Sequence, residues 1–324
     1  MKNIVYKFLK YKFLCIFVNA FNFAFMLKKI QKLLHLASQI DEVKIANQTA
    51  IREEILNYCA LNSQVHGITD QKYGSQEIII SLTTYDKRLS QVYLTIESLM
   101  QQSMKANKIV LWLSDEYAHQ TIPPVLQQQQ NRGLEINFCQ DIRSYKKLIP
   151  SLKKYPDALI ITADDDLYYH PNMIENLVFS YLKDPHFIYF NRGFTIRLKN
   201  HLPIPYKKWE SITHQEVSPL NFPTSGGGVL YPPKCFNEEV FNEAVFSTLC
   251  PWADDVWFKA MSLYNGTPSK KAVTLSPVGD EFLVNKSVQN SGLKLINNGQ
   301  NQNDVQIKNV FDKYDLYPLL TVCR

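Results

Sequence analysis

The sequence predicts an α/β protein built on a doubly wound, mostly parallel β-sheet, with a helical extension at its N-terminus. A composition of 45% hydrophobic and 20% charged residues is typical of a chain with a large buried core. Helix-like segments separate the apolar runs, and strands that alternate with helices form parallel sheets. Four short runs at intervals of 24 to 30 residues are typical of buried strands: Ile78–Leu82, Lys108–Leu113, Leu134–Phe138 and Ala158–Thr162.

Charge is distributed unevenly along the chain. The formal net charge is +5, from 35 basic and 30 acidic residues, but residues 1–36 hold seven lysines and no acid. The remainder carries no basic excess, so we expect no nucleic-acid binding. The six cysteines show neither a CxxC pair nor zinc-ligand spacing, which favours a reducing compartment.

Residues 1–36 form a basic and apolar arm. Its 15-residue apolar run, Phe13–Leu27, is shorter than the roughly 20 residues of a spanning helix. We expect the arm to lie on the anionic inner face of the cell membrane, which would make the protein cytoplasmic and peripheral. A short tilted span and a plain packing helix are the alternatives.

Residues 37–75 are expected to be a helical stalk or linker. Apolar residues recur at three- and four-residue steps from Ile30 to about Tyr58, which predicts a helix. This helix would either join two copies as a homodimer or pack on the main domain. We expect that domain over residues 76–285, and a C-terminal lid and helix over residues 286–324.

The residues that follow the first strand are candidates for binding a ligand, because ligands of doubly wound sheets lie beyond the carboxyl ends of the strands. Thr83 and Tyr85 can hydrogen-bond to or stack on a base, and Arg88 can reach a diphosphate. A polar loop with one solvated arginine is the alternative. Neither a Walker motif nor GxGxxG follows, which disfavours P-loop enzymes and dinucleotide oxidoreductases.

The loop after the third strand carries Asp141, Lys146 and Lys147. Proline is tolerated in the first helical turn, so the next helix is predicted to begin near Pro150. Lysines at that positive end favour an anion site. Solvated surface lysines are the alternative.

The fourth strand ends in three adjacent carboxylates, Asp164, Asp165 and Asp166. Such a cluster repels itself unless a cation neutralises it. Mg²⁺ and Mn²⁺ prefer oxygen ligands and commonly join one or two carboxylates to substrate phosphates. An acidic turn that caps the next helix would explain one aspartate but not three.

With these residues, the sequence resembles a glycosyltransferase of the GT-A fold, of the family-2-like bacterial type. The resemblance covers roughly residues 76–285 and depends on the order of its motifs more than on any one of them. The motifs are the opening IIISLTTYDKR, the DXD motif in ADDD, the glycine segment SGGGVLYPP (225–233) and CPWADDVWFKA (250–260).

The resemblance implies roles for the acidic residues. Asp164 would hold the nucleotide ribose, Asp166 would ligate the metal together with Asp164, and Asp165 could share either role. Asp255 matches the general base of inverting members. Asp254 matches the acid before that base, with helix capping as the alternative.

The resemblance also implies roles outside the acidic residues. Gly226, Gly227 and Gly228 would allow close approach to a bound sugar, or else form a tight structural turn. Trp252 would stack on a sugar ring or pack. Many such enzymes give the metal a late histidine, but the last histidine here is His214, so the third ligand has no match. The stretch 285–303 is expected to act as a mobile lid.

We therefore expect a glycosyltransferase that depends on Mn²⁺ or Mg²⁺ and transfers a sugar from a nucleoside diphosphate sugar. The acceptor would be a glycan or a lipid-linked molecule, and the reaction an inverting step of bacterial lipopolysaccharide or capsule synthesis. One alternative is a nucleotidyltransferase acting on sugar phosphates. Another is a nonenzymatic protein that binds sugar nucleotides on the same scaffold.

Overall fold

A computed structural model describes residues 32, 35–275, 282–285 and 301–321 of the chain. The chain divides into two compact units, residues 1–51 and 52–324. Residues 35–62 are helical, as the apolar periodicity predicts. Within the described ranges, no helix combines the length and apolarity that a membrane crossing requires. The apolar run Phe13–Leu27 lies outside these ranges, so the membrane anchor stays a prediction.

The second unit is built on a seven-stranded sheet with the order β13-β6-β12-β4-β1-β2-β3. The strands are β1 (Ile78–Thr83), β2 (Lys108–Ser114), β3 (Leu134–Cys139), β4 (Leu159–Thr162), β6 (Ile188–Phe190), β12 (Val229–Tyr231) and β13 (Ser269–Lys271). Only β12 runs antiparallel to its neighbours, β4 and β6. The mostly parallel sheet and its four predicted strands are confirmed.

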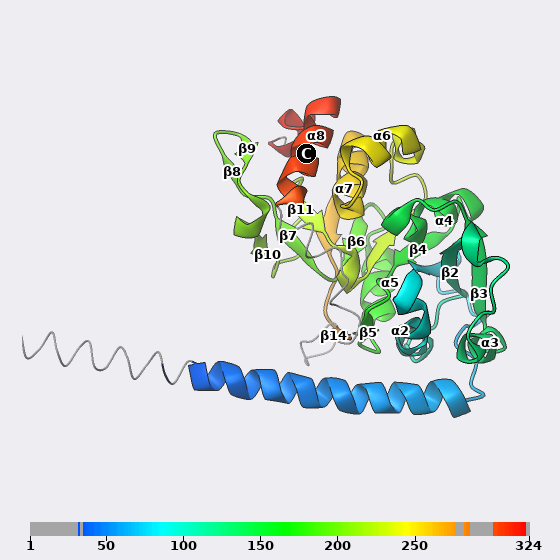
Figure 1. Ribbon diagram of the computed structural model, residues 1–324. Helices are drawn as coiled ribbons and strands as arrows, with labels where there is room; N and C mark the ends of the chain where they lie inside the picture. Colours follow the sequence, from blue (N-terminus) through cyan, green and yellow to red (C-terminus); the bar gives the residue numbers. More distant parts are fainter. Residues whose placement is uncertain (1–31, 33–34, 276–281, 286–300, 322–324) are drawn as a thin grey trace, which may run out of the picture. The chain divides into compact units, whose positions relative to one another are not determined.

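Helices cover both faces of this sheet, as a doubly wound fold requires (Figure 1). Ile78, Ile80 and Leu82 of β1 bury their side chains in one core with α2 (Val92–Met100), α3 (Pro124–Gln130) and α5 (Met173–Lys183). Ile160 of β4 points to the other core, which contains α4 (Ile149–Lys154), α7 (Asp254–Tyr264) and α8 (Gln302–Tyr314). Helix α4 has Pro150 in its first turn, as predicted.

Shorter elements complete the unit around these layers. They are β5 (Leu167–Tyr169), β7 (Gly193–Thr195), β8 (Leu198–Lys199), β9 (Leu202–Pro203), β10 (Glu210–Ser211), β11 (Asn221–Pro223), β14 (Phe282–Val284) and α6 (Glu243–Leu249). Strands β7, β10 and β11 form a second sheet, and β14 pairs with β5. Helix α8 belongs to the same unit as the sheet. The domain limits predicted at residues 75 and 285 stay predictions.

The strand order reverses between β1 and β4. From β1 the chain adds β2 and β3 on one side, whereas β4 pairs with the other side of β1. Ser81 lies opposite Thr162, so the segments that follow the two strands leave the sheet side by side. A reversal of this kind opens a crevice at the carboxyl edge of the sheet, where ligands of such folds bind.

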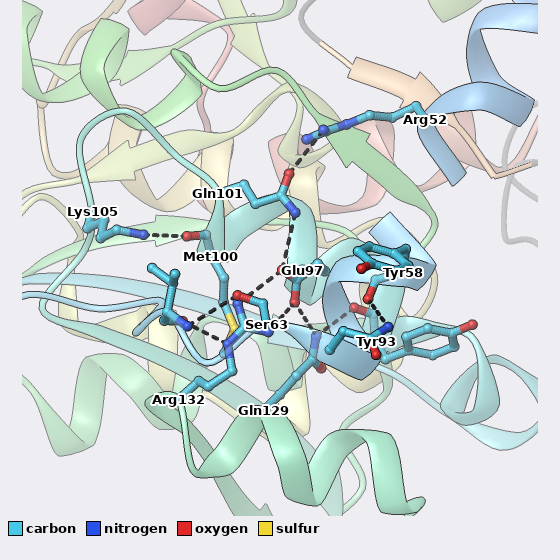
Figure 2. A network of polar contacts seen from close by, with 12 residues as sticks. Arg52, Tyr58, Ser63, Tyr93, Glu97, Met100, Gln101, Lys105, Gln129 and Arg132 are labelled. Carbon is cyan, nitrogen blue, oxygen red and sulfur yellow. Dashed lines mark hydrogen bonds and ion pairs between the residues drawn. The ribbon is translucent and has the colours of Figure 1, made fainter. Parts of the chain in front are cut away.

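A buried ion pair holds the C-terminal half of α2 against neighbouring segments (Figure 2). The guanidinium of Arg132 meets both carboxylate oxygens of Glu97, at 2.7 and 3.0 Å. Gln129 donates to the same carboxylate, and Arg132 also donates to the backbone carbonyl of Val65 at 2.7 Å. The pair therefore connects α2, the end of α3 and the segment that follows the helix of residues 35–62.

Removal of Arg132 should destabilise the fold strongly, because it leaves the Glu97 carboxylate buried without its cation. We expect Arg132→Ala to lower the free energy of unfolding by about 3–5 kcal/mol in urea titrations. Arg197 is the control, since its pair with Glu210 is exposed, and Arg197→Ala should cost at most about 1 kcal/mol. Equal losses in the two variants would contradict the role given to the buried pair.

Candidate functional site

A cavity of about 900 Å³ lies at the carboxyl edge of the sheet, where the strand order reverses. The loops after β1, β3 and β4 line it together with the start of α7. The structure brings these predicted site residues together on its walls: Thr83, Tyr85, Arg88, Asp141, Lys146, Lys147, Asp164, Asp165, Asp166, Gly226, Trp252, Asp254 and Asp255.

The three aspartates after β4 have different surroundings. Asp165 is buried, and its carboxylate accepts hydrogen bonds from Thr84 at 2.6 Å and from Arg88 at 2.5 Å. Arg88 also reaches Asp166 at 3.2 Å. Asp165 therefore holds the loop after β1 against the loop after β4, and this contact occupies both of its oxygens.

Burial raises the pKa of two of these three aspartates. It raises the pKa of Asp165, against the opposing effect of Arg88. It also raises the pKa of Asp166 to about 6, with a further contribution from Asp164. The Asp166 carboxyl therefore loses its proton near pH 6, well above the pH at which an aspartate usually does so.

Lys147 bridges the two sides of the cavity. Its ammonium nitrogen lies 2.6 Å from a carboxylate oxygen of Asp164 and 3.0 Å from one of Asp254, and the lysine is nearly buried. Burial lowers the pKa of Lys147, but Asp164 and Asp254 outweigh it, so the pKa lies well above its usual value. Lys146 pairs in turn with Asp141. Both lysines of the predicted anion site thus have acidic partners, and neither is a solvated surface lysine.

Asp255 is held by the glycine segment. Its carboxylate accepts hydrogen bonds from the backbone N–H of Ser225 at 3.1 Å and from the Ser225 hydroxyl at 2.5 Å. Burial raises the pKa of Asp255 to about 7, and Asp254 adds to the shift. A half-buried carboxyl that titrates near neutral pH is suited to accept a proton from a substrate.

The alternative interpretation, in which Asp254 caps α7, is wrong. The N-cap residue is Ala253, and Asp254 is the first helical residue, with no capping hydrogen bond from its side chain. Its carboxylate turns to Lys147 instead. The ion pair with Lys147 stabilises Asp254 more than helix capping would, because it also removes the cost of an unpaired buried charge.

The three glycines serve different purposes. A Cβ on Gly226 would lie 3.4 Å from a carboxylate oxygen of Asp164, so this glycine faces the cavity. A Cβ on Gly227 would lie 2.5 Å from the Cβ of Arg192, and Gly228 has a φ of +88° that favours glycine. Gly226 therefore fits the close-approach interpretation, whereas Gly227 and Gly228 shape a structural turn behind the wall.

The aromatic residues of the wall are paired with arginines. The Arg143 guanidinium lies 3.7 Å from the ring centroid of Trp252, and that of Arg88 lies 5.5 Å from the ring of Tyr85. The predicted stacking of Trp252 on a sugar stays a prediction. Sequence reasoning did not select Arg143, although it lies in the loop after β3, and it missed Arg192, which follows β6, a strand of three residues.

Two carboxylates can serve a metal ion here. In the part of the chain that the structure describes, no three His, Cys, Asp or Glu side chains are arranged as a metal site. Asp164 and Asp166 both line the cavity, and the bonds to Lys147 and Arg88 engage one oxygen of each. A divalent cation that shares its ligands with substrate phosphates needs only one or two carboxylates, so these two fit. Most of the predicted lid, residues 286–300, lies outside the described residues.

Comparison with known proteins gives likenesses in structure only. No family model and no curated protein matches the sequence. The chain is similar to residues 1–349 of TarS from S. aureus, with 13% identity, a TM-score of 0.41, and 64% of this chain and 59% of that chain covered.

Two further solved structures are similar. CMP:2-keto-3-deoxy-manno-octonic acid synthetase with CTP shows 12% identity and a TM-score of 0.38, over 70% of this chain and all of that one (100%). Mannosyltransferase PcManGT from Pyrobaculum calidifontis, with GDP-Man and Mn²⁺, shows 11% identity and a TM-score of 0.30, over 46% and 45%. All three TM-scores lie below 0.5, so these likenesses carry no argument about reaction or ligand.

Loss of Lys147 should destabilise the site, because it leaves Asp164 and Asp254 without their shared cation. We expect Lys147→Met to lower the free energy of unfolding by about 3–5 kcal/mol, measured by chemical denaturation. Adding Asp254→Asn should recover part of that loss, since one of the two unpaired charges disappears.

Lys146→Met is the matched control, because the Asp141 partner is 57% exposed and water can solvate it. Its cost should stay near 0–1 kcal/mol. A double variant no more stable than Lys147→Met alone would show that the ion pair with Asp254 contributes nothing.

Proposed function

We propose that this chain is a metal-dependent glycosyltransferase that moves a sugar from a nucleoside diphosphate sugar to a glycan or lipid-linked acceptor. The observation that carries the proposal is the position of Asp255. It is a half-buried carboxyl with a pKa of about 7, in the same cavity as the Asp164–Asp166 cluster at the reversal of the strand order.

The donor would lie along the carboxyl ends of β1, β2 and β3. Thr83, Tyr85 and Asp141 line this part of the cavity and offer hydrogen-bonding and stacking groups to a nucleoside. A volume of about 900 Å³ suits a nucleotide sugar, since pockets for small molecules measure about 300–1,000 Å³. Arg88 and Lys147, beside the acidic cluster, would face the diphosphate.

Asp166 and Asp164 would hold Mn²⁺ or Mg²⁺ at the diphosphate. When bound, the cation supplies stabilisation of the negative charge that builds on the leaving group. The protein contributes the position of the two carboxylates, because Arg88 and Lys147 hold one oxygen of each.

Asp255 would act on the acceptor. Its carboxylate takes the proton of the acceptor hydroxyl while that oxygen bonds to the anomeric carbon and the bond to the diphosphate oxygen breaks. The departing nucleoside diphosphate keeps the electron pair, and the configuration at the anomeric carbon inverts. Ser225 fixes the carboxylate through two hydrogen bonds during this single displacement.

The wider setting is also a proposal. The seven lysines of residues 1–36 would attach the enzyme to the anionic inner face of the membrane, where lipid-linked acceptors are presented. Such an acceptor fits lipopolysaccharide or capsule synthesis. The catalytic domain would span residues 76–285, and residues 286–324 would supply the lid and last helix.

Product analysis tests the reaction class. The full chain, with Mn²⁺ and a panel of nucleoside diphosphate sugars, should release a nucleoside diphosphate. Pyrophosphate release from a nucleoside triphosphate and a sugar phosphate would instead show a nucleotidyltransferase. Tight binding of a donor without any turnover would show a nonenzymatic binding protein.

Asp255→Asn should cut turnover by about 10²- to 10⁴-fold at saturating donor and leave the donor affinity nearly unchanged. The wild-type rate should rise with pH through about 7, because only the ionised carboxyl accepts a proton. This pH dependence should disappear from the residual rate of the variant.

The control for Asp255 is Asp312→Asn on α8, because Asp312 does not line the cavity. Folding of each variant is checked by thermal melting. A normal rate in Asp255→Asn, with its pH dependence intact, would overturn the assignment of the base and favour a retaining reaction.

Asp166→Asn should abolish the activity that Mn²⁺ restores after treatment with a chelator, and the protein should remain folded. Asp165→Asn is the comparison, because Asp165 binds Thr84 and Arg88 and should act mainly on stability. Rates of donor turnover and unfolding transitions are measured for both. Full metal-dependent activity in Asp166→Asn would exclude it as the ligand.

A further inference from the structure

Arg192 is an exposed cation on the wall of the cavity. Among the described residues, no carboxylate lies within ion-pair distance of its guanidinium. The group lies 5.5 Å from the ring centroid of Phe194 and 5.6 Å from that of Phe282. Aromatic faces attract a guanidinium but leave its charge available to an anion.

The other cations of the cavity are engaged. Arg88 and Lys147 are paired with the acidic cluster, and Lys146 with Asp141. Arg143 stacks on Trp252 and donates to the backbone carbonyl of Pro251. Arg192 therefore differs from the cations that balance the charge of the protein itself.

The backbone links Arg192 to the segment that holds the proposed base. Thr224 donates to the carbonyl oxygen of Arg192 from its backbone N–H at 3.1 Å and from its hydroxyl at 3.3 Å. Ser225, the next residue, holds Asp255, and Gly227 has no side chain to keep the Arg192 backbone away.

The pKa of Tyr206 indicates that the charges of Asp255 and Arg192 both act on this residue. Burial is the main cause of its raised pKa, Asp255 raises it further, and Arg192 lowers it. Tyr206 lies on the same cavity wall, within range of both charges.

Arg192 follows β6, and β12 separates β6 from β4 in the sheet. The proposed donor loops follow β1, β2 and β3 on the other side of β4. The strand order thus puts Arg192 across β4 from the proposed donor loops, which leaves its part of the cavity to the acceptor.

We propose that Arg192 binds an oxyanion, a phosphate or carboxylate, carried by the acceptor. This inference rests on the proposed glycosyl transfer and names the chemical class of the acceptor. A guanidinium pairs with two oxygens of either group through parallel hydrogen bonds. An anionic acceptor needs such a partner, because it would otherwise meet Asp255 and the acidic cluster with nothing to offset the repulsion.

Calorimetric titration of the full chain tests the subsite with four probes. Glucose 1-phosphate and glucuronate carry the oxyanion, methyl glucoside is neutral, and decyl phosphate places the phosphate on an alkyl chain. A nucleoside diphosphate is present at saturation, so that the donor site cannot take up the phosphate probes. The proteins compared are wild type, Arg192→Ala, Arg192→Lys and Arg197→Ala.

We expect Arg192→Ala to weaken binding of the anionic probes at least tenfold and to leave methyl glucoside unchanged. Arg192→Lys should recover part of the affinity, because an ammonium keeps the charge but not the paired geometry. Arg197→Ala is the matched control outside the cavity and should bind as wild type does. Tighter binding of decyl phosphate than of glucose 1-phosphate would indicate a lipid-linked acceptor, and the reverse order a soluble one.

Equal binding of the anionic probes to wild type and Arg192→Ala would overturn the inference. So would methyl glucoside binding as tightly as glucose 1-phosphate. The failure of the proposed function has a separate sign, which is the absence of nucleoside diphosphate release from every donor, including slow hydrolysis by water. Arg197→Ala should keep that hydrolysis at the wild-type rate, since Arg197 does not line the cavity.

Discussion

Two buried cations stabilise five of the carboxylates that line the cavity, those of residues 164–166 and of Asp254 and Asp255. Arg88 joins two of the five and Lys147 joins two others. Each ion pair is largely removed from water, so neither partner can be left alone without a large electrostatic cost. The positions of the loops around the cavity therefore depend on one another.

This electrostatic constraint separates the roles of neighbouring residues. Asp165 points into the protein and joins two loops, whereas Asp164 and Asp166 keep an oxygen each for the cavity. Among the described residues, no cation forms an ion pair with Asp255; the neutral Ser225 holds it instead, and burial is the main cause of its raised pKa. Adjacent aspartates thus acquire different chemistry from the partners that the fold provides.

The same constraint bears on the metal. Three adjacent carboxylates at a strand end predict a divalent cation, but Arg88 and Lys147 already balance much of that charge. Two carboxylates with one engaged oxygen each remain a reasonable half-site for a cation that substrate phosphates complete. In the proposed function, the donor phosphates would therefore complete the binding of a cation that these two carboxylates begin.

The apolar pattern of the sequence predicts four of the seven strands of the main sheet, β1 to β4, and the acidic end of β4. Both are local: a buried strand needs a continuous apolar run, and its polar end follows in the next residues. The tertiary structure alone decided the partners, because Lys147 meets Asp254 only after the sheet order brings distant segments to one edge. Arg192 could not be selected from the sequence for a related reason. The strand before it, β6, has only three residues, too few for a pattern, and the contact of Arg192 with Thr224, next to the residue that holds Asp255, forms only in the fold. Side-chain chemistry can be listed from a sequence, whereas pairing and burial, which set charge and pKa, depend on which segments the fold makes neighbours.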